Sequence, residues 1–337
     1  MKSIKVLGMA LLGMSIIMAS CSGEDGKDGL PGDKGDKGAQ GDQGPKGDQG
    51  DQGDQGDQGD PGADGQDGSD KPNMEFYFQN GYNDYTGTQD AQISPDGLND
   101  TNNEFMVIRE DLGDPNGMRQ SVIRFDGISG VVNTAFDTDG ANCGESYRVD
   151  QAILYLYSHF STVDVATPGY IHLGFYEDGD PLFDESLVSW TAANSIDNWN
   201  FNGAGSWWAD NPFPGTDGYT NYMPSITTTS KALGWIAIPL PRDIVSNWIC
   251  DASGENNKGI RLRLTTDLGN GESTRMGFFT SENGNTDLRP LLVVQTTEVE
   301  PSATTKMAPS SKAKDWDSMS YEEKMAPLYR YFAAKGL

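Results

Sequence analysis

The residues best suited to bind a ligand are aromatic side chains crowded into a stretch of low charge, from Trp199 to Tyr222. Flat aromatic rings can bury the apolar face of a sugar, and nearby asparagines can hydrogen-bond its hydroxyl groups. We therefore expect Trp207, Trp208, Tyr219 and Tyr222 to bind a polysaccharide or another cell-surface glycan. The alternative is a long surface loop that folds onto itself and uses its tryptophans as a small core of its own.

Turns rich in Asp and Asn offer the oxygen ligands that Ca²⁺ takes. Asp96, Asn99 and Asp100 form such a cluster, and we take them as candidate ligands of a structural calcium ion. The chain has no Asp-x-Asp-x-Asp-Gly loop, so solvated loop carboxylates are the alternative. We expect no other cofactor.

Catalytic motifs are absent from the sequence. It contains two histidines and no G-x-S-x-G, H-E-x-x-H or phosphate-binding glycine loop. The net charge of −26 excludes electrostatic docking to nucleic acid. The sequence therefore favours a non-catalytic protein.

The three cysteines lie far apart, so no CxxC metal or redox motif exists. In an exported protein, Cys143 and Cys250 are candidates for a disulfide bond. Two buried free thiols are the alternative, because spacing in the sequence does not show whether the two residues meet.

The N-terminus predicts export. Lys2 and Lys5 precede an apolar run within residues 1–20, and Met18-Ala19-Ser20-Cys21 resembles a bacterial lipobox. This resemblance implies that Cys21 is lipidated and that acyl chains are the only contact with the membrane. The acidic residues after Cys21 look like the surface-export signal of Bacteroidota lipoproteins, which implies an outer-membrane protein exposed at the cell surface. The alternative is an ordinary signal peptide with a chance cysteine.

Residues 21–72 are predicted to form a stalk. From Gly23 to Gly68 every third residue is glycine, as the crowded axis of a collagen triple helix requires. Proline is sparse, however, and acidic residues outnumber lysines. A homotrimeric collagen-like stalk and an extended, disordered tether are both compatible with this pattern. Either one holds the next domain away from the cell surface.

Residues 76–298 predict an all-β fold, because short alternating runs are separated by clusters of Gly, Asn, Asp and Pro. Many short strands with long polar loops indicate a β-sandwich. Ala152 to Tyr157 reads as a strand buried on both faces, and Asp243 to Trp248 as a short helix. The other expected strands are 105–109, 121–125, 170–175, 235–238, 259–264 and 291–295.

The order of motifs in this region resembles the DNRLRE domain, a jelly-roll β-sandwich of bacterial surface proteins related to carbohydrate-binding module family 96. The motifs that carry the resemblance are Gln89-Asp90-Ala91-Gln92-Ile93, Arg119 to Asp126, Val149 to Tyr157, Val188 to Thr191, Trp235 to Trp248, Asn257 to Ile260, Thr280-Ser281-Glu282 and Leu288 to Leu291. Pro239-Leu240-Pro241 and the insertion from Asn194 to Ser230 depart from the family pattern. The resemblance implies a non-catalytic, carbohydrate-binding jelly roll.

The tail, residues 299–337, reads as a linker and a short helix. Ser320 to Glu323 fits a capping box, and the helix could pack on its own sandwich or on a partner. The whole sequence predicts a surface lipoprotein that displays a carbohydrate-binding sandwich on a collagen-like stalk. A structural or adhesive protein without a glycan ligand is the alternative function.

Overall fold

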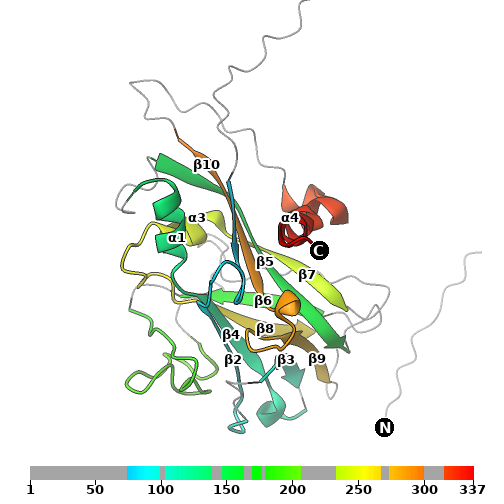
Figure 1. The fold of residues 1–337 in the computed structure, drawn as a ribbon. Coiled ribbons are helices and arrows are strands. Elements are labelled where there is room, and N and C mark those ends of the chain that lie inside the picture. Colours follow the sequence, from blue (N-terminus) through cyan, green and yellow to red (C-terminus); the bar gives the residue numbers. More distant parts are fainter. Residues whose placement is uncertain are drawn as a thin grey trace, which may run out of the picture. The chain divides into compact units, whose positions relative to one another are not determined.

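A computed structural model describes residues 74–98, 103–111, 113–138, 146–162, 169–176, 179–205, 233–266, 273–299 and 315–337. Within them, two antiparallel β-sheets pack face to face around a common core (Figure 1). The predicted all-β sandwich is therefore confirmed.

The larger sheet, sheet A, is built around one long strand, β5. Its order is β1-β10-β5-β9-β3, and β7 also pairs with β5. The strands are β1 (Met74–Phe78), β3 (Phe105–Asp111), β5 (Tyr147–Ser161), β7 (Gly234–Leu240), β9 (Ser273–Phe279) and β10 (Leu291–Glu298). At 15 residues, β5 is long enough to pair with β10 over its first part and with β9 at its end.

The smaller sheet, sheet B, has the order β2-β4-β8-β6. Its strands are β2 (Thr88–Ile93), β4 (Gln120–Phe125), β6 (Gly169–Phe175) and β8 (Ile260–Thr266). In β4, Ile123 and Phe125 belong to the core between the sheets, whereas Val122 belongs to a separate cluster on the outer face. This alternation is what a strand with a side-chain period of two produces.

Both faces of sheet A are covered near the middle of β5. Ile153, Leu154, Tyr155 and Leu156 are each no more than 1% exposed, which confirms the expectation for this strand. Leu154 and Leu156 face the core, whereas Ile153 and Tyr155 pack under the C-terminal helix. The strand is therefore apolar on both faces because each face packs against another layer.

The C-terminal helix, α4 (Tyr321–Lys335), packs on the outer face of sheet A (Figure 1). It begins with the predicted capping box of Ser320 and Glu323 and ends at Gly336 in the left-handed conformation. Met325, Leu328 and Tyr331 are buried against the sheet. The helix therefore binds its own sandwich, which was one of the two expectations for it.

The outer face of sheet B is covered by the segment from Phe183 to Gly205, which contains no named helix or strand. Phe183, Val188 and Trp199 pack there on Ala91 and Ile93 of β2 and on Val122 of β4. We call this the covering segment. It includes the beginning of the insertion that departs from the family pattern.

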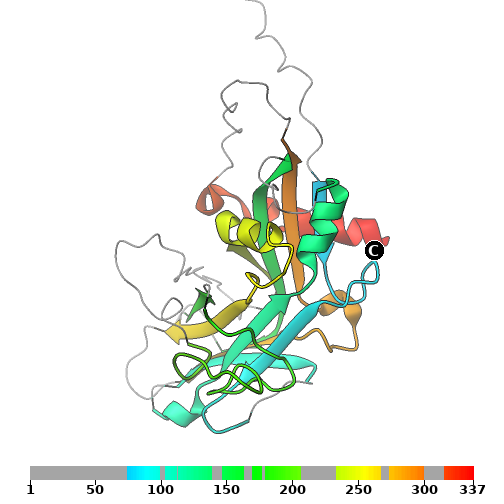
Figure 2. The ribbon, with the colours of Figure 1, turned by 90° about the vertical axis from the view of Figure 1, so that its left-hand side faces the viewer.

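Three elements were not predicted: β1, β9 and the helix α1 (Ile128–Ala135). The expected short helix forms as α3 (Arg242–Ile249), and it packs beside α1 at the end of the sandwich where β5 begins (Figure 2). Three short 3₁₀ turns complete the structure: η1 (Pro115–Gly117), η2 (Thr286–Leu288) and η3 (Trp316–Ser318). No helix in the described ranges is both long and apolar enough to cross a bilayer.

Candidate functional site

The four aromatic residues predicted to bind glycan, Trp207, Trp208, Tyr219 and Tyr222, lie outside the described residues. The neighbouring Trp199 is described and is 6% exposed. Its ring stacks on Tyr176 with a centroid distance of 5.5 Å, and its Nε1 donates a hydrogen bond to the Ser189 carbonyl at 3.0 Å. Trp199 is therefore a core residue of the covering segment rather than an exposed stacking surface.

Two of the three cysteines, Cys21 and Cys143, also lie outside the described residues. Cys250, just after α3, is disulfide-bonded. Its pairing with Cys143 and the lipidation of Cys21 stay predictions.

Asp96, one of the three predicted calcium ligands, is already engaged by protein groups. Its Oδ1 accepts hydrogen bonds from the Ser94 hydroxyl at 2.5 Å and the Leu98 amide at 3.1 Å. Its Oδ2 accepts one from Arg119 at 2.8 Å. Both oxygens of Asp96 therefore have protein partners, and calcium binding at this turn stays a prediction. Asn99 and Asp100 lie outside the described residues.

Aromatic rings from four strands of sheet A form a continuous row. Tyr157 meets Trp235 edge-on at 5.5 Å and stacks on Phe279 at 5.6 Å, while His159 stacks on Phe279 at 4.9 Å and meets Phe105 at 5.4 Å. We call Trp235, Tyr157, Phe279, His159 and Phe105 the aromatic row. It crosses the sheet from β7 through β5 and β9 to β3.

The aromatic row lies on the outer face of sheet A, because its residues alternate with core residues such as Met106 and Phe278. Trp235 touches Phe332 of α4. Four members of the row are half-buried, and Phe105 is 43% exposed. The row therefore presents ring surface to solvent.

Gly277 explains how the rings can lie so close to the sheet. A β-carbon at this position would come within 2.7 Å of both His159 Nε2 and Phe160 Cδ1.

Beside Gly277, the exposed Arg275 places its guanidinium carbon 4.9 Å from the centroid of the Phe160 ring. Burial lowers the pKa of His159, which favours the neutral imidazole. This surface can stack on apolar faces of a ligand and donate hydrogen bonds from Arg275.

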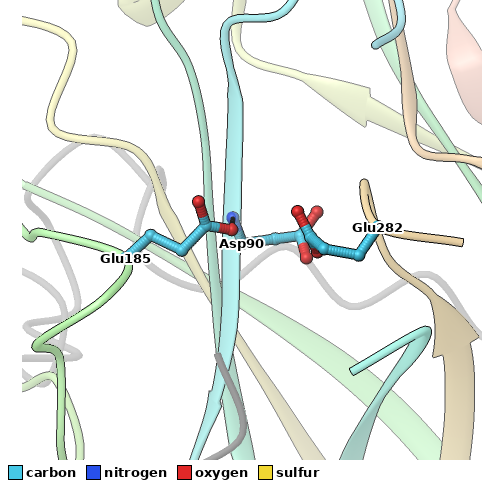
Figure 3. A group of neighbouring side chains, drawn as sticks. All are labelled: Asp90, Glu185 and Glu282. Atoms are coloured by element: carbon cyan, nitrogen blue, oxygen red, sulfur yellow. Dashed lines mark hydrogen bonds between the residues drawn. The ribbon is translucent and has the colours of Figure 1, made fainter. Parts of the chain in front are cut away.

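A second group of side chains, all carboxylates, meets at the edge of sheet B. Asp90 lies in β2, the edge strand, and its Oδ2 accepts a hydrogen bond from the Ser281 amide at 2.8 Å. Its own amide donates to Glu185 Oε1 at 2.9 Å. One oxygen each of Asp90, Glu185 and Glu282 lies within 4.8 Å of the other two (Figure 3). We call these three residues the carboxylate triad.

The edge position of β2 explains why Glu185 is there. An edge strand leaves alternate backbone groups without a partner strand, and side chains take over this role along β2. The Asn80 side chain binds the amide and carbonyl of Thr88, at 2.9 Å and 3.3 Å, and Glu185 binds the next outward amide, that of Asp90. The covering segment thus reaches the edge strand through a carboxylate.

Burial makes it unfavourable for the carboxyl groups of Asp90 and Glu185 to be ionised, and their pKa values are raised as a result. Asp90 is 1% exposed, and desolvation together with the nearby Glu282 and Glu185 raises its pKa well above the usual value. Desolvation, with a further contribution from Glu282, raises the pKa of Glu185 to about 7. The state in which all three carboxyl groups are ionised is therefore unfavourable unless a cation is bound.

Sequence reasoning missed both the aromatic row and the triad. Tyr157 ends the predicted strand 152–157 and His159 follows it two positions later, and this alternation was the available signal for the row. For the triad the signal was weaker. It was an aspartate, Asp90, inside a strand pattern, where this residue type is uncommon.

Comparison with known proteins identifies the segment before the sandwich. Residues 20–73 match the family described as "Collagen triple helix repeat (20 copies)". The match covers the predicted stalk, so the collagen-like repeat is confirmed as part of this chain. No curated protein matches the chain significantly.

Proposed function

We propose that this protein is a surface lipoprotein that displays a non-catalytic, polysaccharide-binding β-sandwich on a collagen-like stalk. The observation that carries the binding function is the aromatic row on sheet A. The lipid anchor at Cys21, the outer-membrane location and the DNRLRE-type family of the sandwich belong to the same proposal, and the sequence motifs support them.

The chemistry of the aromatic row suits a sugar chain. Rings of Tyr157, Phe279 and Phe105 offer apolar surface to the C–H faces of sugar units, and each ring buried by a ligand contributes apolar area. Arg275, at the side of the row, can donate to hydroxyl or carboxylate groups, so uronic-acid polymers are the ligand class with the best match. Trp207, Trp208, Tyr219 and Tyr222 stay candidates for a further glycan contact.

The stalk would increase the effect of a weak site. Three sandwiches on one triple helix would raise the effective concentration of the second and third sites after the first has bound. A collagen-like repeat placed between an anchor and a binding domain is therefore consistent with multivalent binding at a cell surface.

A glycan array and calorimetry with the full-length protein would test this function. We expect binding to one polysaccharide class and a loss of affinity of about tenfold or more for Tyr157→Ala or Phe279→Ala. Tyr329→Ala, which removes an exposed ring from α4, is the matched control and should bind normally. Trp207→Ala and Trp208→Ala test the insertion in the same assay.

The alternative function predicts a different result. If no glycan binds the wild-type protein, the sandwich serves as a structural or adhesive module and the aromatic row is packing surface only. If glycan binds but only the insertion variants lose affinity, the binding site lies in residues 206–232 and the row is not part of it.

A further inference from the structure

Two carboxylate oxygens of the carboxylate triad are buried without a hydrogen-bond donor. Asp90 Oδ1 and Glu282 Oε2 have no partner within the part of the chain that the structure describes. The other oxygen of each is engaged, since Asp90 Oδ2 accepts from the Ser281 amide at 2.8 Å and Glu282 Oε1 from the Ser281 hydroxyl at 2.6 Å. A buried acceptor without a donor lowers the stability of the fold. A bound cation would satisfy these two oxygens.

The three carboxyl groups gather around Asp90. Figure 3 draws those of Asp90 and Glu282 next to each other on one side of β2, and that of Glu185 on the other side, beside the backbone nitrogen of Asp90. Asp90 is almost fully buried, and the two glutamates are half-buried. The group is therefore built into the fold on one side and open toward solvent on the other.

The nearby positive charge is already engaged. The charge of Arg124 only partly opposes the rise that burial causes in the pKa of Glu185, and its Nε and Nη2 donate to Asp126 at 2.5 Å and 3.1 Å. Its Nη1 donates to the Phe183 carbonyl at 2.5 Å. Its charge is thus largely balanced by Asp126, and no ion pair with the triad is found within the ranges that the structure describes.

We propose that Asp90, Glu185 and Glu282 bind a calcium ion. Anionic oxygens are the ligands of hard divalent cations. Oxygens within 4.8 Å of one another need only small side-chain shifts to reach one ion whose bonds are about 2.3–2.6 Å long. Mg²⁺ is less suitable, because it demands a near-ideal octahedron with bonds of about 2.0–2.1 Å. Water can complete the coordination on the open side.

A calcium ion at this position would join three segments that are distant in sequence. Asp90 belongs to sheet B, Glu282 follows β9 of sheet A, and Glu185 belongs to the covering segment. The ion would therefore hold the edge strand of sheet B, the segment that follows β9 and the covering segment together. This inference does not depend on glycan binding.

Thermal unfolding and calorimetry of the full-length protein test the site. After treatment with a chelator and its removal, CaCl₂ should raise the melting temperature of the sandwich by about 5 °C at saturation, whereas MgCl₂ should have a much smaller effect. Asp90→Asn and Glu282→Gln should each weaken calcium binding by at least about tenfold, since each removes a charged ligand.

A matched control separates this site from diffuse binding to the acidic stalk. Glu255→Gln removes an exposed carboxylate from a loop and should keep the full calcium effect. Asp90→Asn preserves the shape of the side chain and removes charge, so it should fold and should melt no lower than the wild type in chelator.

The competing explanation is a proton shared between Asp90 and Glu282. In that case calcium would leave the melting temperature unchanged, and the proposal would be overturned. It would also be overturned if Asp90→Asn and Glu282→Gln kept the wild-type response to calcium, because the ion would then bind elsewhere.

Discussion

Arg330 of α4 donates from Nε to both carboxylate oxygens of Glu75 in β1, at 3.0 Å and 2.9 Å, across 255 positions of the sequence. Glu75 also accepts hydrogen bonds from Tyr77 and Gln295, both at 2.6 Å. The ion pair lies beside the buried contact of α4 with sheet A, where Tyr331 donates to Gln79. It therefore links the end of the chain to the first strand of the sandwich.

This ion pair predicts a pH dependence of stability. Burial alone would raise the pKa of Glu75, but the hydrogen bonds from Arg330 and Tyr77 hold it below its ordinary value of 4.5. Because the folded-state pKa is the lower one, the stabilisation is complete above the unfolded-state pKa and is lost as the pH falls through the folded-state pKa. Arg330 is half exposed, so we expect about 1 kcal/mol or less.

Unfolding of the wild type and Glu75→Gln should be measured between pH 7 and pH 3. The difference in their free energies of unfolding should shrink as the pH falls below about 5. The corresponding difference for Glu255→Gln, which changes an exposed loop carboxylate, should stay flat. A constant difference for Glu75→Gln would show that the ion pair does not stabilise the fold.

Tyr331 should be a main contributor to the attachment of α4. Its side chain is fully buried against Tyr77 and Tyr82, with ring centroids 5.2 Å and 5.0 Å away. Tyr331→Ala should therefore destabilise the protein by about 3–5 kcal/mol, as large aromatic deletions in cores do. Tyr331→Phe keeps the ring and should cost only about 1–2 kcal/mol, because it leaves Gln79 without its donor.

Chemical denaturation of both variants gives these free energies. Tyr321→Ala is the control, because Tyr321 lies at the exposed start of the same helix. If Tyr331→Ala melted like the wild type, α4 would not be part of the cooperative fold.

The collagen-like repeat should set the oligomeric state. Only glycine fits at the axis of a triple helix, so Gly53→Ala should lower the melting temperature of the stalk without changing that of the sandwich. Mass in solution and circular dichroism of residues 22–337 check this. A trimer with a cooperative collagen-type transition is expected, whereas a monomer without that transition would make the repeat an extended tether.

The close approach of the rings to Gly277 makes the aromatic row sensitive to one added methyl group. Gly277→Ala would place a carbon atom 2.7 Å from His159 and Phe160, so both rings must move. We expect lower stability by about 1–3 kcal/mol and weaker glycan binding by the full-length protein. Unchanged glycan affinity with lower stability would exclude this part of the row from the binding surface.

The features that follow from local rules could be predicted from the amino-acid sequence. Glycine at every third position identifies a collagen-like repeat, because the constraint acts on each triplet separately. The alternation around Leu154 identified a strand covered on both faces, and Ser320 with Glu323 identified the start of α4. Each of these patterns lies within a few neighbouring residues.

Contacts between residues that are distant in the sequence could be found only from the folded structure. Asp90 lies 95 positions from Glu185 and 191 positions from Ser281, the residue before Glu282. No local sequence pattern relates these segments. The aromatic row likewise needs the order β7-β5-β9-β3, which backbone pairing and core packing select together. The physical reason is that strand neighbours and the attachment of α4 are fixed by burial of apolar surface over the whole sandwich, a property that no short stretch of sequence contains.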